Sequence, residues 1–153
     1  MPKIFDSIAA IKAFVGQPAV SGDAITVDQE TINAFAAVSQ DSQWIHTDPQ
    51  RAALESPFKT TIAHGLLTLS LLTGWYHRCF TFPNRKMALN YGFDKVRFTG
   101  VVPCDSRLIG SFQLERVDDI KADEVRCVWH VEVHIEGSER PVMVANWIMQ
   151  VRY

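Results

Sequence analysis

The sequence predicts an α+β fold in which one antiparallel sheet wraps around one long buried central helix. Three observations support it: the helical patterns all lie before residue 80, the later residues alternate as strands do, and residues 61–77 are apolar on nearly every face. Because a helix that is apolar all round must be covered all round, the sheet has to enclose it. The length of 153 residues, without an internal repeat or a linker, predicts a single domain over residues 1–153.

Two helices and a short strand are expected before the polar middle of the chain. Apolar side chains recur at helical spacing over residues 4–15, and the turn-rich segment that follows ends that helix. Residues 24–27 are typical of a short strand. Thr26 and Gln29 resemble a capping box, which predicts that a second helix begins there.

The middle of the chain changes from polar to apolar. Residues 41–60 are polar and irregular, and Pro49 suits the first position of a short helical turn. Residues 61–77 then form the expected central helix. This segment is shorter than the roughly 20 residues that a membrane span needs, so it is interpreted as the core of the domain.

The second half of the chain is predicted to be strand. Residues 124–136 alternate between an apolar face, which includes Trp129 and Val131, and a polar face, with Val128 as the one exception. A hairpin is expected around residues 137–138, before the last strand. Further strands are expected over residues 88–98 (bent at Gly92), 108–114 and 141–153.

Composition argues against several classes of function. With 15 Lys and Arg against 17 Asp and Glu, the chain has no cationic surplus for nucleic acid. The three cysteines lack zinc-site spacing, and His130 and His134 on one strand face are better explained as a solvated surface than as metal ligands. The N-terminus shows no signal-peptide pattern. We therefore expect a cytoplasmic protein that binds no metal and no membrane.

One polar segment could carry chemistry. It contains Asp41, His46 five residues later, and the pair His64–Gly65 where the central helix was expected to begin. Each residue also has a purely structural explanation. Asp41 could cap a turn, His46 could pack against Trp44, His64 could be a satisfied core residue, and Gly65 could allow close helix packing.

The combination resembles the MaoC-like dehydratase family, the (R)-specific enoyl-CoA hydratases of hot-dog fold. The matching segments are QDSQWIHTD, TIAHGLLTLSLL and LNYGFDKVRFTGVVPCDSRLIG, and the resemblance covers about residues 20–153. Within the family the chain is similar to the nodulation protein N subgroup, in which QWIH replaces NPxH. Gln40 stands where the family usually has glycine, which could narrow the site or reorient the residues after it.

The resemblance implies a reaction and a set of site residues. Asp41 and His46 would be the catalytic pair that holds a water, with the choice of base between them open. Gly65 and His64 would accommodate the thioester oxygen, and Asn90 and Arg97 would lie on a strand near the site. The reaction would interconvert trans-2-enoyl-CoA and (R)-3-hydroxyacyl-CoA. It needs no cofactor, because coenzyme A is part of the substrate.

The resemblance also implies a homodimer, because hot-dog proteins pair their sheets edge to edge. Two other functions are compatible with the same fold. One is acyl-thioester hydrolysis, and the other is acyl-thioester binding without catalysis. The spacing between Asp41 and His46, ahead of the His64–Gly65 step, favours the hydratase.

Overall fold

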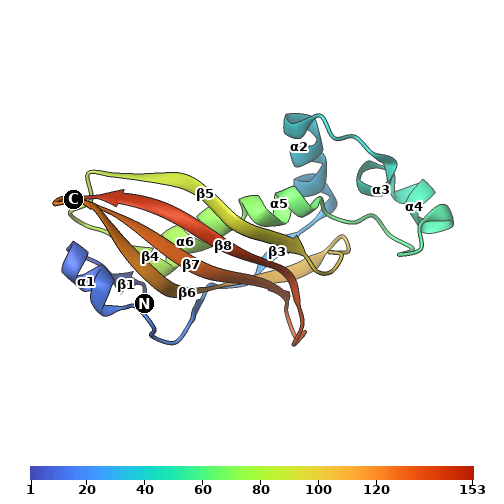
Figure 1. Ribbon diagram of the computed structural model, residues 1–153. Coiled ribbons are helices and arrows are strands. Elements are labelled where there is room, and N and C mark those ends of the chain that lie inside the picture. The colour runs from blue at the N-terminus through green and yellow to red at the C-terminus, as the bar shows by residue number, and fades with distance from the viewer.

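Long antiparallel strands curve around a central helical segment in the computed structural model, which describes residues 1–153 (Figure 1). The elements, in chain order, are β1 (Lys3–Ile4), α1 (Ile8–Ala13), β2 (Val20–Ser21), β3 (Ile25–Val27), α2 (Gln29–Ser39), α3 (Trp44–Thr47), α4 (Pro49–Glu55), α5 (Gly65–Ser70), α6 (Leu72–Cys79), β4 (Phe80–Thr81), β5 (Met87–Phe98), β6 (Ser106–Lys121), β7 (Glu124–Ile135) and β8 (Pro141–Arg152).

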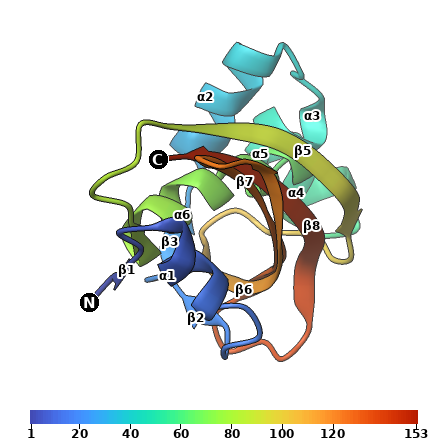
Figure 2. The ribbon, with the colours of Figure 1, turned by 60° about the vertical axis from the view of Figure 1, so that its left-hand side comes forward.

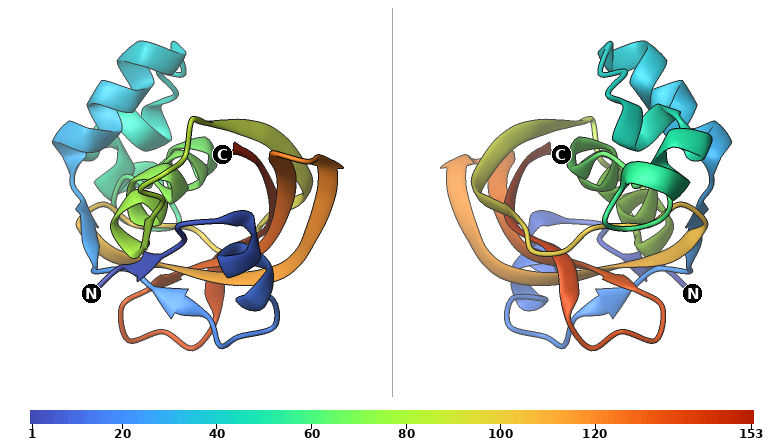
Figure 3. Two further views of the ribbon diagram at one scale, coloured as in Figure 1. Left: turned by 90° about the vertical axis from the view of Figure 1, so that its left-hand side faces the viewer. Right: turned by 90° about the vertical axis from the view of Figure 1, so that its right-hand side faces the viewer.

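The main sheet has the strand order β2-β6-β7-β8-β5, and β3 also pairs with β6. All of its pairs are antiparallel, and Trp129 on β7 lies directly opposite Trp147 on β8. In an oblique view and in two end-on views, the sheet curls around α5 and α6 (Figures 2 and 3). The predicted α+β hot-dog architecture is confirmed.

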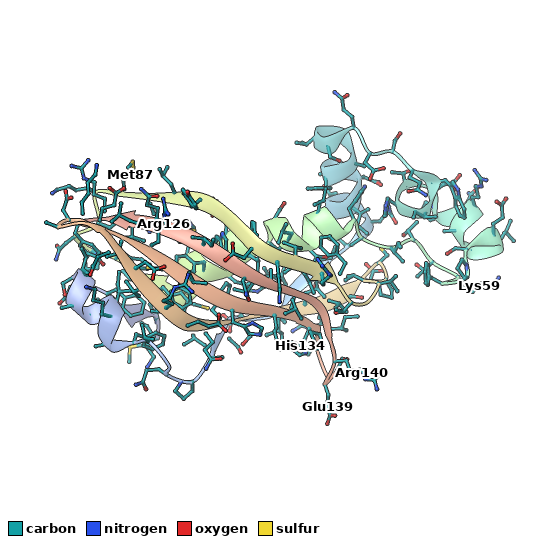
Figure 4. The ribbon with its side chains drawn as sticks, viewed as in Figure 1. Lys59, Met87, Arg126, His134, Glu139 and Arg140 are labelled. Carbon is teal, nitrogen blue, oxygen red and sulfur yellow. The ribbon has the colours of Figure 1, made fainter.

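The period-two pattern of the strands matches their burial. Val125, Cys127, Trp129, Val131 and Val133 are all buried on one face of β7, and Val128 is buried as well. The register of β5 on β8 shifts on both sides of the expected bend. The β7–β8 hairpin projects from the sheet with Glu139 and Arg140 at its tip, as Figure 4 shows.

The central helix differs from the prediction in its start, its continuity and its cover. It begins at Gly65 rather than at residue 61, and it is divided into α5 and α6 at Leu71. Residues 61–64 are extended instead, because Ile62 forms a β-bridge with Pro103. The helix is also not covered on every face, since Leu66 is 60% exposed.

Tight packing fixes the helix against the sheet. The Trp75 ring on α6 lies so close to β6 that a Cβ atom on Gly110 would approach it to 2.6 Å. Only glycine allows this separation of helix and strand. The indole Nε1 of Trp75 donates to the Asp23 carbonyl at 2.9 Å, so the ring is held from both sides.

Two expectations for the N-terminal third are corrected. Residues 3–4 form β1 beside β4, so the first helix covers only Ile8–Ala13, with Ser7 as its N-cap. The cap of α2 is Asp28, whose carboxylate accepts from the Thr31 N–H at 2.8 Å, and not a capping box built on Thr26. Thr26 lies within β3 and pairs with Arg107 of β6, so it precedes the cap by two residues. No helix has the length and apolar character required to cross a membrane.

Candidate active site

A left-handed turn leads from α2 into the segment that carries Asp41. Gln40 ends α2 with φ 60° and ψ 20°, a conformation that favours glycine because a Cβ atom crowds the following carbonyl. This geometry explains why a glycine suits the position. Gln40 is exposed and does not line the pocket that contains His46. The Asp41 carboxylate is exposed and accepts from the Gln43 N–H at 3.4 Å.

His46 is presented by the short helix α3 with its ring buried at 7% exposure. Its Nδ1 lies 2.6 Å from the Ile62 carbonyl oxygen. Because a carbonyl can only accept, Nδ1 carries the hydrogen, and Nε2 of the neutral ring has a free lone pair. Nε2 has no hydrogen-bond partner in the chain, and it is not fully buried, so solvent can reach it.

His64 lies against His46 at the start of α5. The two imidazoles stack with a centroid separation of 3.8 Å and an interplanar angle of 24°. His64 Nε2 lies 3.0 Å from the Asp41 carbonyl oxygen and therefore donates to it, while Nδ1 is buried without a partner. His64 thus ties the loop that bears Asp41 to the beginning of the central helix.

Asp41, His46 and His64 form one cluster, in which one ligand-type atom of each residue lies within 4.8 Å of the others. The predicted pair is therefore brought together. The cluster is poorly suited to a metal ion, because an imidazole binds an ion near its own ring plane and these two planes are stacked. A carboxylate and an imidazole this close together are instead suited to holding a water and moving its protons.

A pocket of about 420 Å³ adjoins this cluster. Its lining is His46, Ile62, Ala63, Gly65, Thr68, Phe98, Thr99, Gly100, Val101, Val102 and Val142. A Cβ atom on Gly65 would lie 2.9–3.0 Å from the Phe98 ring, so a larger residue there would force the ring to shift. Ala63 donates its N–H to the Val102 carbonyl at 2.8 Å, which holds the pocket wall together.

Gln29 supports the site, although the sequence suggested a different role for it. Its Nε2 donates to the His46 carbonyl at 2.7 Å, and its Oε1 accepts from the Thr61 hydroxyl. The side chain therefore joins α2, α3 and the extended segment before α5. No local pattern reveals this contact, because the three residues are far apart in sequence.

Neither Asn90 nor Arg97 forms a hydrogen bond or an ion pair with the Asp41–His46–His64 cluster. Asn90 lines a separate pocket of about 320 Å³, together with Thr73 and Trp147 among others. Arg97 is exposed, lines neither pocket, and donates from Nη1 to the neighbouring Val96 carbonyl at 2.8 Å.

The cysteines do not provide a reactive thiolate. Burial raises the pKa of the Cys79 and Cys104 thiols, and it raises the pKa of Cys127 to about 12. All three are free thiols. They are therefore protonated at neutral pH, and nucleophilic chemistry by cysteine has no support.

Comparison with known proteins gives both a family and a set of relatives. A model of the MaoC like domain family matches residues 11–136. The chain is 42% identical to a 3-hydroxyacyl-thioester dehydratase Z from Mycobacterium tuberculosis, over 99% of this chain and 98% of the relative. It is also 42% identical to a nodulation protein N from Rhizobium leguminosarum, over 96% of this chain and 92% of the relative.

Solved structures agree on the fold. A monoamine oxidase regulatory protein from an Archaeoglobus species superposes with a TM-score of 0.82 at 22% identity, over 99% of this chain and 97% of that one. An (R)-hydratase from A. caviae superposes with a TM-score of 0.72 at 21% identity, over 88% and 94%. Together with the family match and the 42% identical relatives, these findings show that the chain belongs to the MaoC-like dehydratase family.

Proposed function

We propose that this protein is a 3-hydroxyacyl-thioester dehydratase, which interconverts trans-2-enoyl-CoA and (R)-3-hydroxyacyl-CoA. The observation that carries the proposal is the close cluster of Asp41 with His46, a residue that lines the pocket and whose Nε2 has no partner in the chain. The 42% identity to a dehydratase over nearly the full length of both chains supports the same reaction class.

In this proposal Asp41 and His46 hold the reacting water between them. In the hydration direction the water oxygen bonds to C3, and the dyad takes one of the water's protons. The dyad returns a proton to C2, so that one water is added in total. The fixed hydrogen on Nδ1 of His46 favours its Nε2 as the proton acceptor. Gln29 holds the His46 backbone and is a positioning residue.

The thioester oxygen gains negative charge as water adds, so a donor must be placed beside it. We assign this role to the Gly65 N–H. The first hydrogen bond within α5 runs from the Thr68 N–H to the His64 carbonyl, so the N–H of Gly65 has no partner inside the helix. His64 orients the Asp41 loop next to that point. The largely apolar second pocket, which Asn90 lines, is a suitable place for the acyl chain. A substrate role for Arg97 stays a prediction, without a contact to support it.

We further propose that the protein is a homodimer. β5 is the terminal strand of the sheet and exposes several apolar side chains, among them Leu89, Tyr91 and Phe93. An unprotected edge with apolar side chains is rare in a single chain. Pairing two β5 strands, one from each copy, would cover the β5 edge of each sheet.

Hydration of but-2-enoyl-CoA, followed by the loss of enoyl absorbance, tests the reaction. Asp41→Asn and His46→Gln are each expected to lower kcat by about 10²–10⁴-fold while the protein stays folded, because each removes a positioned proton donor or acceptor. Asp94→Asn and His77→Gln, at exposed positions that line neither pocket, are the matched controls. Wild-type rates in both variants would exclude Asp41 and His46 from the mechanism. Release of free thiol by the wild-type protein would instead indicate a thioesterase, and neither signal would indicate a binding protein.

A further inference from the structure

Thr68 has a buried hydroxyl that nothing in the chain satisfies. The residue lies on α5 and is 2% exposed, and its Oγ1 has no hydrogen-bond partner. A threonine in a helix often donates to the carbonyl four residues before it, but here the His64 carbonyl accepts only the Thr68 N–H, at 3.2 Å. An unpaired buried hydroxyl reduces stability, and valine has the same shape without that cost.

The position of Thr68 directs this hydroxyl toward the candidate active site. Thr68 lines the same pocket as His46 and Gly65. Residues three apart on a helix share a face, so Thr68 and Gly65 are neighbours on α5. Because helical side chains tilt toward the N-terminal end, the Thr68 side chain is directed back toward the turn that begins at Gly65.

We propose that the Thr68 hydroxyl donates a hydrogen bond to the carbonyl oxygen of the bound acyl thioester. The inference rests on the proposed function, which places that oxygen beside Gly65. The hydroxyl then acts as a second donor to the oxygen on which charge develops, and its exclusion from water strengthens the bond. The stability lost through an unpaired hydroxyl is recovered in the substrate complex.

The structure also indicates how the carbonyl reaches this point. The Phe98 ring packs against Gly65 and covers it from the side of the pocket. Phe98 is 46% exposed near the end of β5, so its ring has room to turn aside. A ligand that turns this ring aside would open the space beside Gly65, on the helix face that Thr68 shares.

Thr68→Val and Thr68→Ser test the inference, with Thr81→Val on the exposed surface of β4 as control. Thr68→Val is expected to lower kcat/KM by about 10²–10³-fold, through weaker substrate binding as well as a lower kcat, because the hydrogen bond forms in the bound substrate and strengthens as charge develops. The melting temperature is expected to stay equal or to rise. Thr68→Ser keeps the hydroxyl and is expected to recover most of the activity. Wild-type kcat/KM in Thr68→Val overturns the inference, and so does an equal activity loss in both variants.

A second measurement separates this inference from the proposed reaction. Butanoyl-CoA has the thioester carbonyl but no group to hydrate, and its binding is followed by calorimetry. If the wild-type protein does not hydrate but-2-enoyl-CoA, the proposed function fails by itself. Weaker binding of butanoyl-CoA to Thr68→Val than to the wild type then still supports the hydrogen bond. Equal binding, or no binding to either protein, overturns it.

Discussion

Replacing Gly65 by alanine separates two explanations for this glycine, close packing and access for a carbonyl. The added Cβ would lie 2.9–3.0 Å from three atoms of the Phe98 ring, well inside van der Waals contact. Removing that ring in Phe98→Ala abolishes the overlap without changing the backbone at residue 65. The double variant therefore tests whether Gly65 serves any purpose beyond packing.

The expected magnitudes follow from this geometry. Overpacking a filled space costs about 1–3 kcal/mol, and the partly exposed Phe98 ring can yield, so we expect about 1 kcal/mol for Gly65→Ala alone. For a domain of this size that lowers the melting temperature by about 2–4 °C. In the Phe98→Ala background the same substitution is expected to change stability little, because the space is open.

Activity is expected to behave differently from stability. If the thioester carbonyl occupies the space beside Gly65, the new methyl group displaces it by about 1 Å, which costs about 10²-fold in rate. We therefore expect Gly65→Ala with Phe98→Ala to be about 10²-fold less active than Phe98→Ala alone, at a similar melting temperature. Thermal melting and kcat/KM for the four proteins measure both effects. Equal activity of the double variant and Phe98→Ala would refute the carbonyl role and leave packing as the whole explanation.

Three further predictions address the turn, a buried thiol and the assembly. Gln40→Gly is expected to raise the free energy of unfolding by about 1 kcal/mol in a urea titration, because glycine adopts the left-handed conformation of residue 40 without strain; an unchanged or lower value would contradict this. The Cys127 thiol, with its pKa raised to about 12, is expected to resist a disulfide reagent at pH 8 until the chain is unfolded; rapid labelling of this residue in the native protein would show that it is accessible. Light scattering is expected to give twice the 17.3 kDa chain mass, and Leu89→Lys on the β5 edge to shift the protein toward monomer; a single-chain mass at all concentrations would exclude the dimer.

The sequence was most informative where one periodicity determines both structure and burial. Trp129 and Val131 sit at alternate positions of residues 124–136, and both are buried on the concave face of β7. The start of the central helix was harder to predict. Ile62 and Ala63 are apolar, so they fit a buried helix and a buried extended segment equally well. The partner that decides between them, Val102, lies about 40 residues away in the sequence.

The residues of the candidate site also differ in whether the sequence alone could identify them. Asp41, His46 and Gly65 could be identified from the order and spacing of motif residues. Gln29 and Thr68 could not, because their roles depend on contacts that no local pattern encodes. Gln29 is recognised by its bond to the His46 carbonyl, and Thr68 by the absence of any bond from a buried hydroxyl.

The late start of the central helix has a direct chemical consequence for His46. Had the helix begun at residue 61, the Ile62 carbonyl would have accepted the N–H of residue 66 within the helix. In the extended segment that carbonyl is free, and it accepts from Nδ1 of His46 at 2.6 Å. Ile62 is itself held in place, because its N–H donates to the Ile45 carbonyl at 3.0 Å. The extended residues 61–64 thus fix the tautomer of the imidazole and leave its Nε2 as the free proton acceptor.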